Sequence, residues 1–138
     1  MQELTILALT KNLPQVLDFV DRNLEALGCS ATDQMQMDVA VEEIFVNIAS
    51  YAYQPEEGTA VVRFETAEGP ASVVVTFADR GVPYDPLAKP DPDISQSLRN
   101  RQRGGLGIFM TKQYMDGVEY QYRDGQNILT LRKRLERP

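Results

Sequence analysis

A long amphipathic helical pattern ends near Ala52 and carries two polar side chains on an otherwise apolar surface. At 100° per residue, its apolar positions fall within one broad stripe that is expected to face the core: Val41, Ile44, Phe45, Ile48 and Ala52. Glu43 and Asn47 lie four residues apart, roughly 110 to 150° from the centre of that stripe. The pattern therefore predicts a helix, capped by Ser30 or Thr32, with a carboxylate and an amide side by side at the edge of the core.

Apolar periodicity predicts two more helices and several strands around this helix. A short apolar run favours a first strand, and Pro14 begins a helix that Gly28 closes. The strands are expected at 3–9, 60–66, 72–78, 118–122 and 128–135, and the last helix at 108–115. The strand at 72–78 is apolar nearly throughout, so we expect it at the centre of the sheet. Asp124-Gly125-Gln126-Asn127 is expected to join the last two strands.

This order of elements predicts an α/β (α+β) two-layer sandwich. The sheet is expected to be mixed but mostly antiparallel, with four to five strands and three helices on one face. The stretch from about 86 to 103 has several prolines and no sustained periodicity, which is typical of a functional lid or a disordered loop. A chain of 138 residues with 43% hydrophobic content suits one domain over 1–138.

Composition excludes several kinds of chemistry. The formal net charge is −6, which disfavours a general nucleic-acid binder because such proteins need a basic face. Cys29 is the one cysteine and histidine is absent, so an intrachain disulfide, a zinc site and histidine-based catalysis are all excluded. The sequence shows neither a signal peptide nor an apolar run of ~18 residues, so no membrane span is predicted. We expect a cytoplasmic protein whose chemistry uses carboxylates, hydroxyls, arginine or lysine.

Three stretches are candidates for a functional site. Glu43 and Asn47 offer hard oxygen ligands for Mg²⁺, or a general base with an orienting neighbour, although this spacing is also common on solvated helices. Asp79 ends the central strand and Gly81 follows it. A carboxylate there can accept a hydrogen bond from an exocyclic amine while the glycine lets a ring approach, and the alternative for Asp79-Arg80-Gly81 is a plain turn.

The third stretch is a glycine cluster that opens the last predicted helix. Gly104-Gly105-Leu106-Gly107 combines glycines without Cβ atoms and the unpaired N–H groups of a first helical turn. Such groups can hold phosphate. Taken alone, a glycine cluster is weak evidence for a phosphate site.

Together and in this order, the three stretches resemble the N, G1 and G2 boxes of the Bergerat-fold, histidine-kinase-like ATPases, a superfamily that includes gyrase, Hsp90 chaperones, histidine kinases and MutL. The matching runs are V-E-E-I-F-V-N-I-A-S-Y-A-Y, F-A-D-R-G-V-P-Y-D-P and R-G-G-L-G-I-F-M-T-K-Q-Y-M-D-G-V-E-Y. They are most similar to the anti-sigma factor serine/threonine kinases of bacterial partner-switching systems. In that branch Tyr51 stands where many members carry histidine, and Pro83 where relatives usually carry a second glycine.

The resemblance implies ATP and Mg²⁺ as cofactors and assigns a role to each matching position. Glu43 would be the general base and Asn47 the Mg²⁺ ligand. Asp79 and Gly81 would bind adenine. The residues that would border the phosphates are Gly104, Gly105, Leu106 and Gly107. Arg103 would contact the terminal phosphate, and its alternative is a solvated charge like those of Arg99 and Arg101.

The resemblance also implies the function. We expect an ATP-dependent serine/threonine protein kinase that phosphorylates an anti-sigma factor antagonist, a STAS-domain protein, and alternately sequesters a sigma factor. A homodimer is common in the family. The alternative is a nucleotide-binding partner-switch module that regulates a protein without phosphoryl transfer, or one whose ligand is a phosphatase or an antagonist. The sequence names neither the sigma factor nor the antagonist.

Overall fold

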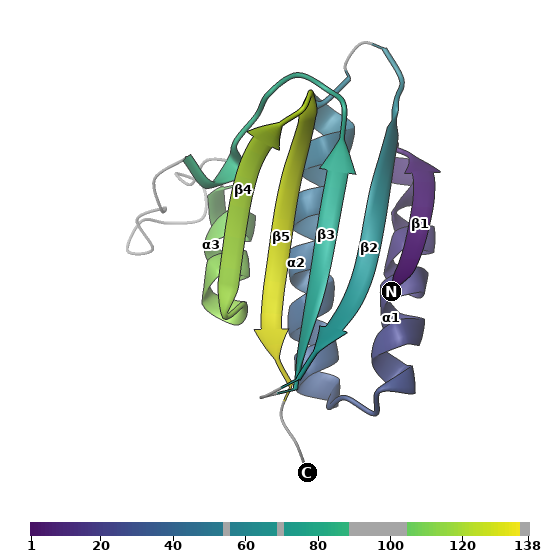
Figure 1. The fold of residues 1–138 in the computed structure, drawn as a ribbon, viewed down its shortest axis with the longest axis vertical. Coiled ribbons are helices and arrows are strands. Elements are labelled where there is room, and N and C mark those ends of the chain that lie inside the picture. Colours follow the sequence, from purple (N-terminus) through teal and green to yellow (C-terminus); the bar gives the residue numbers. More distant parts are fainter. Residues whose placement is uncertain (54–55, 69–70, 89–104, 136–138) are drawn as a thin grey trace.

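The computed structural model describes residues 1–53, 56–68, 71–88 and 105–135, and it shows one sheet covered on one face by helices (Figure 1). The strand order is β1-β2-β3-β5-β4. The strands span Gln2–Leu7 (β1), Thr59–Ala67 (β2), Ser72–Asp79 (β3), Gly117–Arg123 (β4) and Gln126–Arg134 (β5). Every pairing between neighbouring strands of this sheet is antiparallel. The predicted sandwich is confirmed, and the apolar strand β3 lies at the centre as expected.

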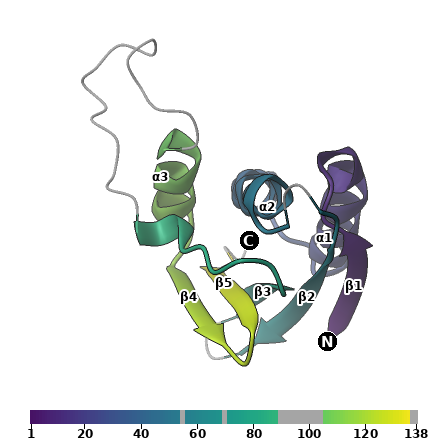
Figure 2. The ribbon, with the colours of Figure 1, turned by 90° about the horizontal axis from the view of Figure 1, so that it is seen from above.

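Three helices pack on one face of the sheet. They span Leu13–Ala26 (α1), Ala31–Tyr51 (α2) and Gly105–Tyr114 (α3), and two short 3-10 helices span Thr10–Asn12 (η1) and Pro86–Ala88 (η2). Figure 2 shows α2 between α1 and α3, all on the same side of the curved sheet. The opposite face of the sheet carries no helix within the part of the chain that the structure describes.

The central helix α2 begins and packs as its sequence predicts. The Ser30 side chain accepts a hydrogen bond from the Asp33 backbone N–H at 3.0 Å. Of the two predicted candidates, Ser30 and Thr32, Ser30 therefore caps the helix. Val41, Ile44 and Phe45 are almost fully buried. Glu43 and Asn47 are half-buried, at the edge of the apolar stripe. The predicted helix face is therefore confirmed.

The hydrophobic core lies between the helices and the inner face of the sheet. Alternate residues of each strand point inward because side chains on a strand alternate between faces. The fully buried contributors from the sheet are Ala60, Val62, Val73, Val75 and Leu131, and those from α1 are Val16, Val20 and Leu24. This packing fixes α2 over the central strands.

A buried ion pair ties α2 to the sheet at the end where α2 begins. Lys133 of β5 lies 3.6 Å from the Asp33 carboxylate and donates hydrogen bonds to Gln36 Oε1 at 2.7 Å and to the Tyr114 carbonyl at 3.1 Å. Asp33 and Lys133 are both buried. One charged side chain thereby links α2, β5 and the end of α3.

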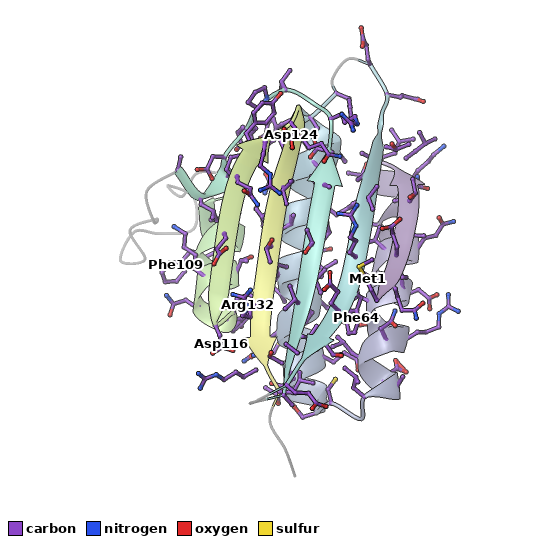
Figure 3. All side chains as sticks on the ribbon, in the orientation of Figure 1. Met1, Phe64, Phe109, Asp116, Asp124 and Arg132 are labelled. Carbon is purple, nitrogen blue, oxygen red and sulfur yellow. The ribbon has the colours of Figure 1, made fainter. Side chains whose placement is uncertain are left out.

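The last hairpin differs from the sequence expectation. Its turn contains only Asp124 and Gly125, both with positive φ, so Gln126 and Asn127 are already part of β5. A two-residue turn of this kind matches the twist of antiparallel strands and favours Asp-Gly. In Figure 3 Asp124 marks this turn at the upper end of the sheet, with Asp116 at the lower end. The expectation that Asn127 belongs to the turn was wrong.

Two smaller expectations are also settled. The first strand ends at Leu7 rather than Leu9, because the chain then turns into η1. Of the expected lid, residues 86–88 form η2, and 89–103 lie outside the described residues. Within the described residues, no helix is both long and apolar enough to cross a membrane.

Candidate functional site

A pocket opens where the end of α2 meets the end of β3 and the beginning of β5. About 370 Å³ of empty space lies between its lining residues, a volume that includes open solvent. Its apolar walls are Ile44, Ile48, Phe77, Val82 and Leu129. Its polar groups are Asn47, Asp79, Asn127 and three tyrosines, Tyr51, Tyr84 and Tyr120. Two of the predicted motifs, those of Asn47 and Asp79, therefore face one cavity.

Asp79 is held at the floor of this pocket by fixed hydrogen bonds. Its side chain is 5% exposed. Its Oδ1 atom accepts from the Gly81 backbone N–H at 2.9 Å and from Asn127 Nδ2 at 2.9 Å. Asn127 stands directly opposite Asp79 in the register of β3 and β5. A buried carboxylate with a defined orientation lies where the sequence predicted one.

Gly81 is required by the protein's own packing. A Cβ atom built on Gly81 would overlap the backbone of Ala52 at the end of α2. The next residue, Val82, donates its N–H to the Ala52 carbonyl at 2.9 Å, which satisfies a carbonyl that the helix end leaves unpaired. The close approach at this glycine is therefore made by α2, and the loop after β3 is fastened to the end of that helix.

Glu43, Asn47 and Gly107 form a second group next to the pocket. Asn47 Nδ2 donates to Glu43 Oε1 at 3.2 Å and to the Glu43 carbonyl at 3.0 Å. A Cβ atom on Gly107 would overlap the Glu43 carboxylate. The structure thus brings the predicted carboxylate–amide pair against the glycine cluster, although the two are more than sixty residues apart in the chain.

The glycine cluster lies at the beginning of a helix, as predicted. Gly105, Leu106 and Gly107 form the first turn of α3, whose N–H groups have no partners within the helix. Thr111, fully buried, donates to the Gly107 carbonyl at 2.8 Å. This turn can hold an anion next to the Glu43 carboxylate. Arg103 and Gly104 lie outside the described residues.

The donor set at Asn47 fits a magnesium ion bound mainly through a nucleotide. Both acceptors at Asn47 Nδ2 belong to Glu43, so the nitrogen faces Glu43 and the amide oxygen Oδ1 points away. The described residues contain no group of three or more Cys, Asp or Glu side chains that could enclose a metal. Mg²⁺ commonly takes one or two protein oxygens, with phosphates and water completing its octahedron. The residues present fit that mode of binding.

Sequence reasoning missed three features of the pocket. Tyr51 and Tyr84 stack with ring centroids 4.9 Å apart, so the tyrosine that replaces histidine closes one side of the pocket. Asn127 was assigned to a turn. Burial raises the pKa of the Tyr120 hydroxyl, which keeps it protonated at neutral pH as a donor to Asn127 Oδ1. The Asp-Gly turn signal alone could have placed Asn127 in a strand.

Comparison with known proteins gives consistent matches. Residues 6–133 match the family described as the histidine kinase-like ATPase domain. The serine/threonine-protein kinase BtrW of Bordetella bronchiseptica is 32% identical over 102 residues, which cover 74% of this chain and 71% of BtrW. The serine-protein kinase RsbW of Bacillus cereus is 28% identical over 107 residues, covering 75% of this chain and 66% of RsbW.

A solved structure shares the fold. A crystal structure of RsbU and RsbW domains from Mycobacterium tuberculosis superposes with a TM-score of 0.65 at 17% identity. The match covers 100% of this chain and 34% of the other. At this identity the likeness supports the fold alone.

Proposed function

Because the chain belongs to the histidine kinase-like ATPase domain family, as the match over residues 6–133 shows, we propose that it is an ATP- and Mg²⁺-dependent serine/threonine protein kinase. Its substrate would be an anti-sigma factor antagonist with a STAS domain, and in the alternate state it would bind a sigma factor. The names of its relatives BtrW and RsbW support the kinase activity. Since ATP and sigma factors are cytoplasmic in bacteria, the proposed activity is cytoplasmic as well.

The observation that carries the proposal is the position of the Glu43 carboxylate. It lies against Gly107 in the first turn of α3 and accepts a hydrogen bond from Asn47. A carboxylate beside an anion-binding helix start is placed to accept the proton of a hydroxyl that attacks a terminal phosphate. Asn47 orients that carboxylate through Nδ2 and leaves its Oδ1 for the metal.

The other residues bind and orient the nucleotide in this proposal. Asp79 accepts a hydrogen bond from the exocyclic amine of adenine, whose ring lies between the apolar walls of the pocket. Gly105, Leu106 and Gly107 donate backbone N–H groups to phosphate oxygens, as Gly104 would. Arg103 would offset charge on the terminal phosphate. Asn47 Oδ1 would hold Mg²⁺, which would offset negative charge on the phosphates.

The test is transfer of labelled γ-phosphate to a purified STAS-domain antagonist. Glu43→Gln should keep ATP affinity within about twofold and lower the transfer rate by roughly 10²- to 10⁴-fold, since Gln keeps the shape but lacks a basic carboxylate. Glu42→Gln is the matched control, because Glu42 is the exposed neighbour on the same helix. Transfer by Glu43→Gln at the wild-type rate would refute the base assignment.

The same experiment separates the kinase from a nucleotide-dependent binding module. If wild-type protein transfers no phosphate to any antagonist, while ATP changes its affinity for the antagonist or the sigma factor, the switch function replaces the kinase.

A further inference from the structure

Asn127 sits at the centre of the hydrogen bonds that surround Asp79. Its Nδ2 donates to Asp79 Oδ1 at 2.9 Å and to the Val82 carbonyl at 2.9 Å. Its Oδ1 accepts from the Tyr84 backbone N–H at 3.1 Å and from the Tyr120 hydroxyl. Asn127 lies at the beginning of β5. Its buried amide therefore connects β5 to β3, to the loop after β3 and to β4.

The orientation of this amide is fixed by its partners. The Tyr84 N–H can only donate, so it must meet the amide oxygen. The Val82 carbonyl and an ionised Asp79 carboxylate can only accept, so they must meet the amide nitrogen. An inverted amide would leave buried groups without partners, which is unfavourable. Asn127 thus presents an N–H group to Asp79 in a single direction.

These hydrogen bonds engage one carboxylate oxygen of Asp79 and leave the other available to a ligand. Oδ1 receives two N–H donors, from Gly81 and Asn127. Within the described residues no hydrogen bond reaches Oδ2, and that atom is not among the fully enclosed atoms without a partner. Since Asp79 lines the pocket, Oδ2 is the oxygen that faces it.

From this geometry we propose that Asn127 is a positioning residue that makes the pocket selective for a purine with a 6-amino group. By holding Oδ1, Asn127 fixes the carboxylate plane and offers Oδ2 as a lone acceptor at a set position. An amine can donate to that acceptor, whereas a 6-oxo group or a bare ring carbon cannot. The inference rests on the proposed nucleotide site and extends it to a residue outside the three stretches that resemble nucleotide-binding motifs.

The test is a double-mutant cycle with two nucleotides, measured by calorimetry on the full chain. The nucleotides are ATP and purine riboside triphosphate, which lacks only the 6-amino group. The proteins are the wild type, Asn127→Ala, Asp79→Asn and the double mutant. Loss of a fixed hydrogen bond to a charged group corresponds to a roughly ten- to hundredfold loss of affinity.

We expect Asn127→Ala to weaken ATP binding by roughly tenfold and to change binding of the 6-desamino nucleotide by less than about threefold. In the Asp79→Asn background, Asn127→Ala should add little, because the carboxylate that it positions is gone. Equal losses for both nucleotides, or full additivity in the double mutant, would mean that Asn127 only packs the loop, and would overturn the inference. If Asp79→Asn itself leaves ATP affinity unchanged, the nucleotide site and the inference both fail.

Tyr120→Phe provides a milder variant should Asn127→Ala unfold the protein. It removes one of the two donors at Asn127 Oδ1 and keeps the ring. It should lower ATP affinity about two- to fivefold relative to the 6-desamino nucleotide, a fraction of the loss of a full hydrogen bond. Tyr122→Phe is its matched control, since Tyr122 lies on the same strand and is exposed. No preferential loss in Tyr120→Phe would count against the inference.

Discussion

Gly107 and Glu43 pack so closely that a methyl group on the glycine would occupy the space of the carboxylate. This contact joins α3 to α2 at the point where the proposed general base meets the proposed phosphate site. The absence of a Cβ atom at Gly107 thus has a structural reason that is independent of the proposed phosphate site.

We predict that Gly107→Ala separates stability from activity. Alanine favours a helix over glycine by roughly 1 kcal/mol and the Glu43 side chain can rotate away, so the melting temperature should not fall. Displacing the carboxylate by about 1 Å should lower phosphoryl transfer by roughly a hundredfold. Gly117→Ala is the control, because a Cβ there makes an ordinary contact at 3.7 Å. Wild-type transfer by Gly107→Ala would show that the position of Glu43 is not critical.

We predict that Asn47→Ala weakens ATP binding in the presence of Mg²⁺ by about tenfold or more, and much less in EDTA. The reason is that the variant loses an oxygen ligand of the metal, whereas Asn47 makes no proposed contact with adenine. Titrations with and without Mg²⁺ measure both affinities. Asn23→Ala is a close control, because Asn23 Nδ2 donates to the Phe19 carbonyl at 2.8 Å, the same one-turn bond that Asn47 makes to Glu43. Equal losses with and without Mg²⁺ would argue against a metal ligand.

The sequence predicted those parts of the fold that depend on local signals. The apolar stripe around Ile44, the Ser30 cap and the central position of β3 all follow from periodicity or a cap residue. Asn127 was missed because its role depends on which residues begin β5, and element boundaries carry the weakest signal. The Tyr51–Tyr84 stack was missed because it joins a helix to a loop through tertiary packing.

We predict that Asp38 makes stability fall as the pH rises through neutrality. Burial raises the pKa of Asp38 to about 8, helped next by a hydrogen bond that protonated Asp38 donates to the carboxylate of Asp21 on α1, and then by the negative charges of Asp21, Glu25 and Glu42. The folded state therefore retains a proton that the unfolded chain loses above pH ~4, so folding becomes less favourable between these two values. Asp38→Asn should raise the melting temperature most above pH 8 and least near pH 4.

Melting curves across that range test the prediction. Asp18→Asn is the control, since Asp18 lies in an exposed ion pair with Arg22 on α1. If the difference in melting temperature between Asp38→Asn and wild type does not vary with pH, the folded state does not retain a proton on Asp38.

We predict that Lys133→Met destabilises the protein by roughly 3 kcal/mol, because it removes a buried cation next to Asp33. The double variant Asp33→Leu with Lys133→Met should recover part of that loss, since apolar pairs often replace buried ion pairs at little cost. Urea unfolding measures both. A double variant no more stable than Lys133→Met would show that the hydrogen bonds of Lys133 to Gln36 and Tyr114 carry the stability instead.

The length of the two-residue turn at Asp124 and Gly125 determines which side chains of β4 reach the pocket. It sets the pairing of β4 with β5, in which Tyr120 stands opposite Leu129, two residues from Asn127, and lines the pocket on the side of the helices. If one inserted residue were taken up as a register shift, every side chain of β4 would move to the other face of the sheet, and Tyr120 would point to solvent. The length of a surface turn, remote in sequence from every nucleotide motif, thereby limits how the chain can vary while it keeps the base pocket intact.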